Sequence, residues 1–274
     1  MKQRTINNFD IHYSDQGSGP VLVFVHGFCE DYRIWEQVSQ AVEGYRIVSI
    51  DLPGFGRSEA LAEPSVEGMA EVLRGLLEEL DIDRFLLIGH SMGGYVSLAF
   101  AERHGAQLEG LALVHSHPYA DTEETKVARD RSIQFIRDNG HSVYVRQLML
   151  KLFPADFAQR QPAIIDLLSE RASGYSVEGI IGGLQAMRDR ADRSSVLSQL
   201  SVPVLFIVGE EDMVVPAASS KAQTALPAVA DIQILEGIGH MLMFENPAHF
   251  HRLINNFLVF CQQFALSQDA KTNR

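Results

Sequence analysis

The stretch FLLIGHSMGGYVSLAF (residues 85–100) joins a short apolar run directly to a helical pattern, with a single serine at the junction. The run FLLI is typical of a buried strand, and the residues after the serine are those of a packed helix. Between them lies Gly89-His90-Ser91-Met92-Gly93, a G-x-S-x-G pattern. A sharp strand-to-helix turn needs small flanking residues and holds the serine hydroxyl clear of the sheet. The stretch therefore predicts that Ser91 is a nucleophile.

Apolar runs of similar length lie on both sides of this stretch, and near-continuous runs of this kind suit a parallel sheet covered on both faces. They are VLVFVH (21–26), YRIVSID (45–51), LEGLALVH (108–115), PVLFIVG (203–209) and DIQILEG (231–237). Before them, RTINNFDIHYSD (4–15) alternates in polarity around Asn7-Asn8, which predicts an antiparallel edge hairpin.

Helical periodicity separates the strands, at residues 65–80, 92–104 and 247–265. The polar tail after Leu266 is expected to fray. Strands that alternate with helices imply right-handed crossovers. The predicted fold class is therefore α/β, with a doubly wound, mostly parallel sheet of eight strands.

The alternation stops between residues 117 and 196, where the sequence has helical periodicity and helix-ending glycines and prolines but no strand pattern. We interpret residues 117–196 as a helical cap inserted into a core formed by residues 1–116 and 197–274. A cap at the carboxyl ends of the strands would cover the crevice where open α/β sheets bind ligands.

A serine hydroxyl needs a neighbouring base, and position selects one candidate from the 10 histidines of the chain. His240 lies in EGIGHMLMFENP, after the last predicted strand, and the preceding glycines Gly237 and Gly239 let it reach over the sheet edge. The expected acid is Asp212 in VGEEDMVVP, with Glu210 and Glu211 as rivals. Along the chain the serine comes first, the aspartate second and the histidine third. This is the order found in catalytic triads whose serine lies in a G-x-S-x-G turn.

Acyl transfer also needs backbone donors for the developing oxyanion. The predicted donors are the amide of Met92, directly after the serine, and the amide of Phe28 in the loop after the first long apolar run. Gly27 lets the backbone approach closely, and His26 is interpreted as a buried residue that braces this loop.

Further residues are candidates for the substrate pocket. His115 and His117 leave a strand end that faces the same crevice, and Tyr144 and Met149 belong to the apolar pattern of the cap. Structural roles for both histidines remain open. Cys29 is interpreted as a small buried residue and Trp35 as part of the core. We expect no metal and no cofactor.

Bulk properties narrow the possible partners. The formal charge of −12 disfavours nucleic acid and anionic lipid surfaces. No stretch has the 18 or more apolar residues of a membrane span, no secretory h-region begins the chain, and there are two cysteines. We therefore expect a cytoplasmic protein. Its expected partner is a small-molecule substrate that is largely apolar.

Five segments together resemble the α/β-hydrolase superfamily, in its branch of lidded serine esterases, haloperoxidase-like proteins and C–C hydrolases. They are HGF (26–28), DLPGFGRS (51–58), GHSMGG (89–94), GEEDMVVP (209–216) and GIGHMLMFENP (237–247). Dehalogenases and epoxide hydrolases of this superfamily have an aspartate where this chain has Ser91. The loop HGFCE differs from the glycine-rich loop of C–C hydrolases and from the HGF-proline of perhydrolases.

The resemblance and the residues together predict a carboxylesterase-like serine hydrolase. Cleavage of a thioester, a lactone, an amide or a C–C bond would use the same residues. A slow-turnover receptor of the same fold is the alternative from another functional class, and cofactor-free oxygen chemistry is a third.

Overall fold

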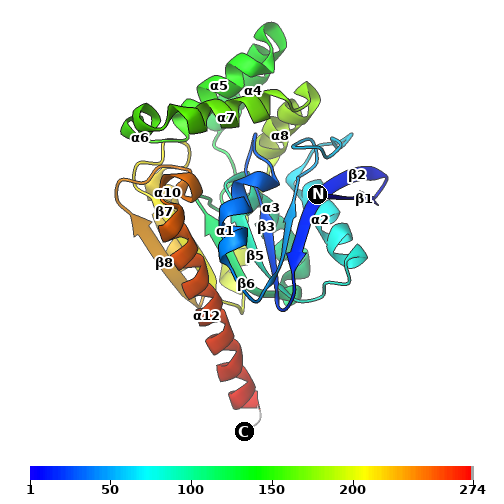
Figure 1. Cartoon of the computed structure of the whole chain (residues 1–274), viewed down its shortest axis with the longest axis vertical. Helices are drawn as coiled ribbons and strands as arrows, with labels where there is room; N and C mark the ends of the chain where they lie inside the picture. The colour runs from blue at the N-terminus through cyan, green and yellow to red at the C-terminus, as the bar shows by residue number, and fades with distance from the viewer. Residues whose placement is uncertain (273–274) are drawn as a thin grey trace.

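The computed structural model describes residues 1–272, and its eight strands form one open sheet (Figure 1). Their order across the sheet is β1-β2-β4-β3-β5-β6-β7-β8. The strands are β1 (Lys2–Ile6), β2 (Phe9–Gly17), β3 (Val21–Val25), β4 (Arg46–Ile50), β5 (Phe85–His90), β6 (Leu108–Val114), β7 (Val204–Gly209) and β8 (Ala230–Leu235). The pairings from β4 to β8 are parallel, and β2 is antiparallel to β1 and β4. The predicted fold class is confirmed.

The two edges of the sheet differ from the buried centre. At one edge, Asn7 and Asn8 both have positive φ, 52° and 71°, as the tight turn of a hairpin requires. At the other edge, β8 leaves Ile232 and Ile234 exposed. The expectation of cover on both faces is therefore wrong for β8, because Ile232 and Ile234 point to the same face of the strand and that face is exposed.

Helices lie on both faces of the sheet, with α1 and α12 in front of it and α2 and α3 behind it in Figure 1. The core helices are η1 (Tyr32–Trp35), α1 (Glu36–Ala41), α2 (Val66–Glu79), α3 (Met92–His104), η2 (Gly105–Gln107), α10 (Ala217–Ala222), η3 (Gln223–Ala225), α11 (Leu242–Glu245) and α12 (Pro247–Thr272). Trp35 is fully buried between Phe24 of β3 and Phe250 of α12, so its expected place in the core is confirmed.

The last helix is longer than the sequence pattern indicated. Helix α12 continues past Leu266 to Thr272 and projects from the body of the protein at the lower end of Figure 1. The apolar stripe ends near residue 265, but no glycine or proline follows to end the helix. The expected fraying after Leu266 is therefore wrong within the described residues.

Between β6 and β7 the described chain contains helices and no strand. These are α4 (Glu123–Asn139), α5 (His141–Lys151), α6 (Ala155–Arg160), α7 (Pro162–Ser173), α8 (Val177–Asp189) and α9 (Ser194–Gln199). Helices α4 to α8 gather in one layer above the carboxyl ends of the strands, at the top of Figure 1. Helix α9 packs against α3 of the core instead, although it begins inside the range expected for the cap.

The chain leaves β3 for β4 on one side and later reaches β5 on the other side of β3. Such a reversal opens a crevice at the carboxyl ends of the two strands. The segment His26-Gly27-Phe28 follows β3, and Ser91 follows β5, so the fold brings both to this crevice. Among the described helices, none has the length and apolar character needed to cross a membrane.

Candidate active site

Ser91 occupies the turn between β5 and α3 in a backbone conformation that few residues adopt. Its φ is 51° and its ψ is −117°. The surroundings fix this conformation, because its amide donates to the Val114 carbonyl (2.9 Å) and its own carbonyl accepts from the Gly94 amide and the Ser116 hydroxyl. Strain of this kind persists only where the structure over-determines it, and it is common at functional sites.

The glycines of the pattern permit the close packing of this turn. A Cβ on Gly93 would lie 2.2 Å from the Val25 carbonyl oxygen, and one on Gly89 would lie 2.5 Å from the Gly93 carbonyl oxygen. Real Cβ atoms do not approach backbone oxygens so closely. Gly93 therefore allows the first turn of α3 to pack directly on the end of β3, and Gly89 allows it to pack on β5.

His240 and Asp212 form a buried pair. His240 Nδ1 lies 2.7 Å from Asp212 Oδ2, and Asp212 Oδ1 accepts the amides of Val214 and Val215, both at 2.8 Å. Burial alone would raise the pKa of Asp212, but the neighbouring imidazoles of His240 and His115 hold it well below its usual range. Glu210 and Glu211, the rival acids, are exposed.

The backbone of His240 is held from both sides. Its amide donates to the Leu152 carbonyl of the cap (2.9 Å), and its carbonyl lies 2.9 Å from His90 Nε2. Ser91 and His240 line the same cavity. The hydrogen bonds of residues 1–272 include none between their side chains, and catalytic contacts of this kind often tighten only when substrate is bound.

The loop after β3 lies beside the serine, as expected. His26 is fully buried, with Nδ1 2.7 Å from the Gly27 carbonyl oxygen and Nε2 accepting the Leu52 amide, so its bracing role is confirmed. Cys29 is buried as expected, and burial raises the pKa of its thiol well above the usual range. Phe28 lines the cavity and Met92 begins α3, which leaves their amides as the predicted oxyanion donors.

Glu30 is a site residue that the sequence analysis missed. It is buried, lines the cavity, accepts the Gly27 amide at 2.6 Å and lies 3.0 Å from His90 Nδ1. Burial opposes both charges, but each partner favours the other's charge, so the pKa of His90 is raised and that of Glu30 is lowered. The sequence signal for this pair was present, because Glu30 ends the segment HGFCE and His90 lies in GHS, directly before the predicted nucleophile.

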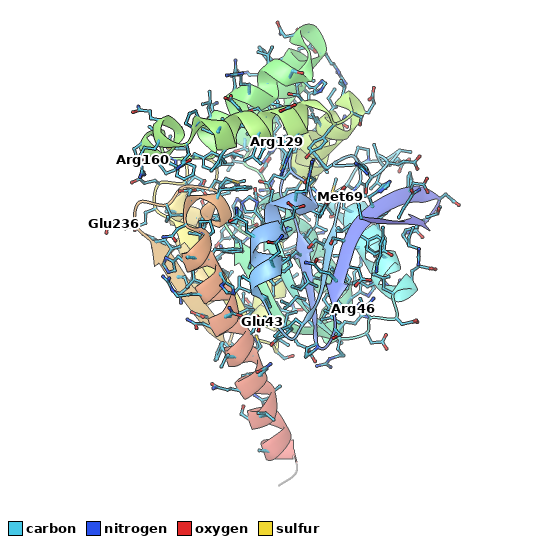
Figure 2. All side chains as sticks on the ribbon, in the orientation of Figure 1. Glu43, Arg46, Met69, Arg129, Arg160 and Glu236 are labelled. Atoms are coloured by element: carbon cyan, nitrogen blue, oxygen red, sulfur yellow. The ribbon has the colours of Figure 1, made fainter. Side chains whose placement is uncertain are left out.

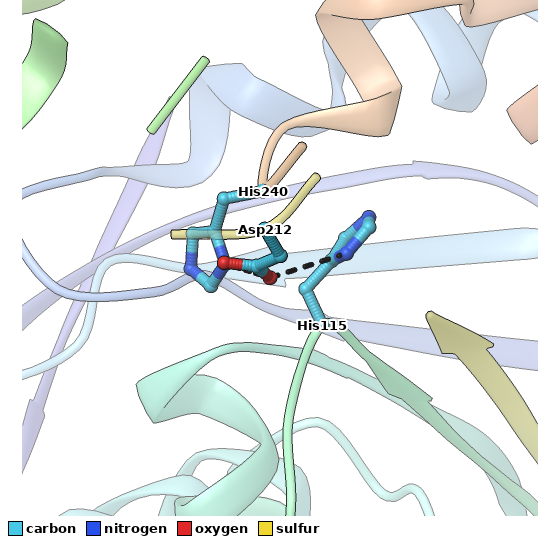
Figure 3. A group of neighbouring side chains, drawn as sticks. All are labelled: His115, Asp212 and His240. Carbon is cyan, nitrogen blue, oxygen red and sulfur yellow. Dashed lines mark hydrogen bonds and ion pairs between the residues drawn. The ribbon is translucent and has the colours of Figure 1, made fainter. Parts of the chain in front are cut away.

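His115, expected in the pocket, does not line the cavity. It lies behind Asp212, with Nδ1 3.6 Å from Asp212 Oδ2 (Figure 3), and burial lowers its pKa to about 4. Within residues 1–272, neither ring nitrogen has a hydrogen-bond partner. It directly follows β6, and its side chain points toward Asp212.

His115, Asp212 and His240 offer ligand atoms within 4.8 Å of one another, which is a donor set that zinc can accept. Asp212 Oδ2 already shares a proton with His240 at 2.7 Å, and a metal there would displace that proton. The arrangement fits an acid that orients a base better than it fits a metal centre.

The cavity above Ser91 has a volume of about 450 Å³ and is partly covered by the cap. Of the residues expected there, His117 and Tyr144 line it. Met149 does not, because its side chain is fully buried in the packing of the cap. The apolar part of the wall consists of Phe28, Leu148, Leu152, Met187, Val214 and Pro216.

A polar part of the wall was not expected from the sequence. It consists of Tyr95, Tyr119, Asp121, Thr122, Thr125 and Arg129. The sequence signal of Arg129 was weak, since charged residues on a helix are usually solvated. Thr125 and Arg129 lie on α4, which packs against α8 in the cap.

Comparisons with known proteins agree with this geometry. The sequence profile described as "Alpha/beta hydrolase family" matches residues 22–250. A putative carbamate hydrolase, RutD, from Yersinia enterocolitica is 26% identical, with 92% of this chain and 91% of that protein covered. A 2-succinyl-6-hydroxy-2,4-cyclohexadiene-1-carboxylate synthase from Salmonella paratyphi B is 28% identical (86% and 93% covered). A thermophilic esterase from Thermogutta terrifontis, solved with malate bound, has a TM-score of 0.88 and 26% identity (95% and 98% covered).

Proposed function

Because the chain belongs to the alpha/beta hydrolase family, we propose that it is a serine hydrolase that cleaves a small carboxylic ester through an acyl-enzyme. The observation that carries the proposal is the 2.7 Å contact between Asp212 and His240, in a site whose cavity also reaches Ser91 on its strained turn. A buried imidazole oriented by a carboxylate is the base that a serine nucleophile needs.

The proposed reaction has two steps. His240 takes the proton of Ser91 as Oγ attacks the ester carbonyl, and the tetrahedral oxyanion accepts hydrogen bonds from the amides of Phe28 and Met92. The C–O bond to the alcohol then breaks, and the alcohol leaves with the proton held by His240. Water, deprotonated by His240, attacks the acyl-enzyme in the same way and releases the acid and Ser91.

Asp212 acts on the histidine in this scheme. Its depressed pKa keeps it ionised at all physiological pH values, so it holds the Nδ1 proton and leaves Nε2 free to accept from Ser91. The two amides on its other oxygen prevent the carboxylate from rotating away.

The cavity volume supports a small substrate, and its apolar wall supports a substrate with an apolar portion. The names of the similar proteins include an esterase and a putative carbamate hydrolase, and both reactions break an acyl bond. Cys29 and Cys261 are both unpaired and buried, which supports the proposal that the enzyme works in the cytoplasm.

Hydrolysis of p-nitrophenyl esters of increasing acyl length tests the proposal. We expect the wild type to be active and Ser91→Ala to lose activity by on the order of 10⁴-fold or more. Ser142→Ala removes an exposed hydroxyl from α5 outside this cavity and is the matched control. An active Ser91→Ala protein would contradict the proposal. A wild type inert to all esters but able to bind ligand would favour the receptor alternative.

A further inference from the structure

We propose that the cap end of the cavity binds a carboxylate carried by the substrate, so that the preferred ester is a half-ester of a dicarboxylic acid. This inference rests on the proposed function and narrows its substrate class. Its structural basis is a group of cationic and donor side chains, Arg129, Arg190 and His117, which we name the donor wall. Arg129, labelled in Figure 2, and His117 line the cavity, and Arg190 lies behind them.

The donor wall carries more positive than negative charge. Arg129 donates through Nε and Nη2 to Asp121, and Arg190 donates through Nη1 to the same carboxylate. The side chains of Arg190 and Asp121 are 2% and 3% exposed. Two guanidinium groups therefore share one buried carboxylate, which leaves an excess of one positive charge beside the cavity. Such an excess in a partly desolvated place favours an anion.

Arg190 and Arg129 have different roles in this group. Arg190 is buried and does not line the cavity; it also donates to the carbonyls of Tyr119 and Met187 and lies 4.0 Å over the ring of Tyr95. Arg129 lines the cavity, and its Nη1 forms no hydrogen bond with any residue from 1 to 272. A guanidinium has five N–H donors and binds carboxylates through two of them at once. Arg129 is the group that can contact the ligand.

His117 adds a neutral donor. Its Nδ1 lies 3.2 Å from the Tyr119 amide nitrogen and so accepts that proton, which assigns the ring's own proton to Nε2. Burial, with the positive charge of Arg190 beside it, lowers the pKa of His117 to about 4, so the ring stays neutral at pH 7. The Nε2–H can donate to an oxygen in the cavity, and this wall presents hydrogen-bond donors to the ligand.

Tyr95 connects the serine end of the cavity with the donor wall. Tyr95 lies one helical turn after Ser91 on α3 and lines the cavity. Its ring packs on His117 (5.5 Å between centroids) and on Arg190. A molecule that spans the cavity from Ser91 past Tyr95 would bring its far end to Arg129. The apolar wall would cover the carbon chain between the two ends.

Other carboxylates do not neutralise this wall. Glu30 lines the cavity at the serine end and is paired with His90. Asp192, which influences His117, is exposed and accepts hydrogen bonds from Ser194.

The test compares ethyl hydrogen adipate with ethyl adipamate, in which an amide of the same shape replaces the carboxylate. We expect the wild type to prefer the charged ester by at least tenfold in kcat/KM. Arg129→Gln should lower kcat/KM for the charged ester by about 10- to 100-fold, which is the range of one charge-assisted contact, and leave the amide within about threefold. Arg137→Gln, which removes the same charge from an exposed position of α4, should behave as wild type.

Equal losses on both esters in Arg129→Gln, or a wild-type preference for the amide, would overturn the inference. Calorimetric binding of adipate to Ser91→Ala, with and without Arg129→Gln, separates it from the proposed function. Adipate binding that depends on Arg129 in a protein inert to esters would leave the carboxylate site standing and remove the esterase. Ester cleavage by the wild type, with no adipate binding to Ser91→Ala, would leave the esterase standing and remove the carboxylate site.

Discussion

At the scale of single residues, the backbone of three positions explains why the site has its shape. Cys29, Ser91 and His115 each follow a strand and each have positive φ, 59°, 51° and 48°. These values are unusual outside glycine and cost energy that the packing around them must offset. All three lie at the carboxyl ends of β3, β5 and β6, so the strain is concentrated around the nucleophile.

Glu30 supports this arrangement without a place in the proposed proton transfers. It ties the Gly27 amide to His90, and His90 contacts the carbonyl of His240. We expect Glu30→Gln to reduce kcat by about tenfold, because the amide keeps an acceptor for Gly27 but loses the charge that holds His90. Glu30→Ala should reduce kcat by more than Glu30→Gln does, and it should also lower the Tm.

The control for this comparison is Glu36→Gln, which makes the same charge change at an exposed position of α1. Kinetics on one ester at fixed pH, with Tm values for each protein, are sufficient. If Glu30→Gln matched Glu36→Gln in both kcat and Tm, Glu30 would have no positioning role.

At the scale of elements, most of the arrangement could be predicted because short-range patterns determine it. The run FLLI before a glycine-flanked serine predicted β5 and α3, and Ser65 begins α2 as a cap whose hydroxyl accepts the Gly68 amide. The end of α12 and the exposed face of β8 could not be predicted in this way. Both depend on which other elements pack against them, and a local sequence pattern does not contain that information.

The packing of α3 on β3 gives a prediction at this scale. Gly93→Ala would place a methyl group 2.2 Å from the Val25 carbonyl oxygen, in contact with backbone that cannot move without β3. We expect this variant to lose several degrees of Tm, or to fail to fold, and to lose most of its ester hydrolysis.

Gly105→Ala is the matched control just past the end of the same helix, since its Cβ would meet only Leu200 Cδ2 at 3.6 Å. It should retain wild-type Tm and activity. Thermal unfolding followed by circular dichroism distinguishes the two variants. A Gly93→Ala protein as stable and active as Gly105→Ala would show that the close approach of α3 to β3 is not needed.

At the scale of the whole molecule, the core of the site could be predicted and its specificity could not. Ser91, Asp212 and His240 each follow a strand in a distinctive local sequence. The members of the donor wall come from α4, the loop after β6 and the segment after α8. Only the packing of the cap segments on one another brings them together. The expected pocket roles of His115 and Met149 failed for the same reason, since the sequence does not tell which side of an element faces the cavity.

The buried histidine behind the acid gives a prediction for global stability. The pKa of His115 is about 4 in the folded protein because of burial, against an ordinary value of 6.5. Between these values the unfolded chain binds a proton that the folded protein does not, so stability falls as pH is lowered from about 6.5 to about 4. The loss from this group alone is on the order of 3 kcal/mol.

His115→Gln removes this titration, so its free energy of unfolding should fall less than that of wild type over the same pH range. Urea unfolding at several pH values between 4 and 7 measures the difference. Parallel curves for the two proteins would contradict the assignment of a neutral, buried imidazole at this position.

The central claim is that Ser91 is a nucleophile activated by His240. Labelling with a fluorophosphonate, followed by intact-mass measurement and peptide mapping, tests it without knowledge of the natural substrate. We expect wild type to gain one phosphonyl adduct on Ser91, and Ser91→Ala and His240→Ala to gain none on the same timescale. An adduct on another residue, or equal labelling of Ser91→Ala, would contradict the account.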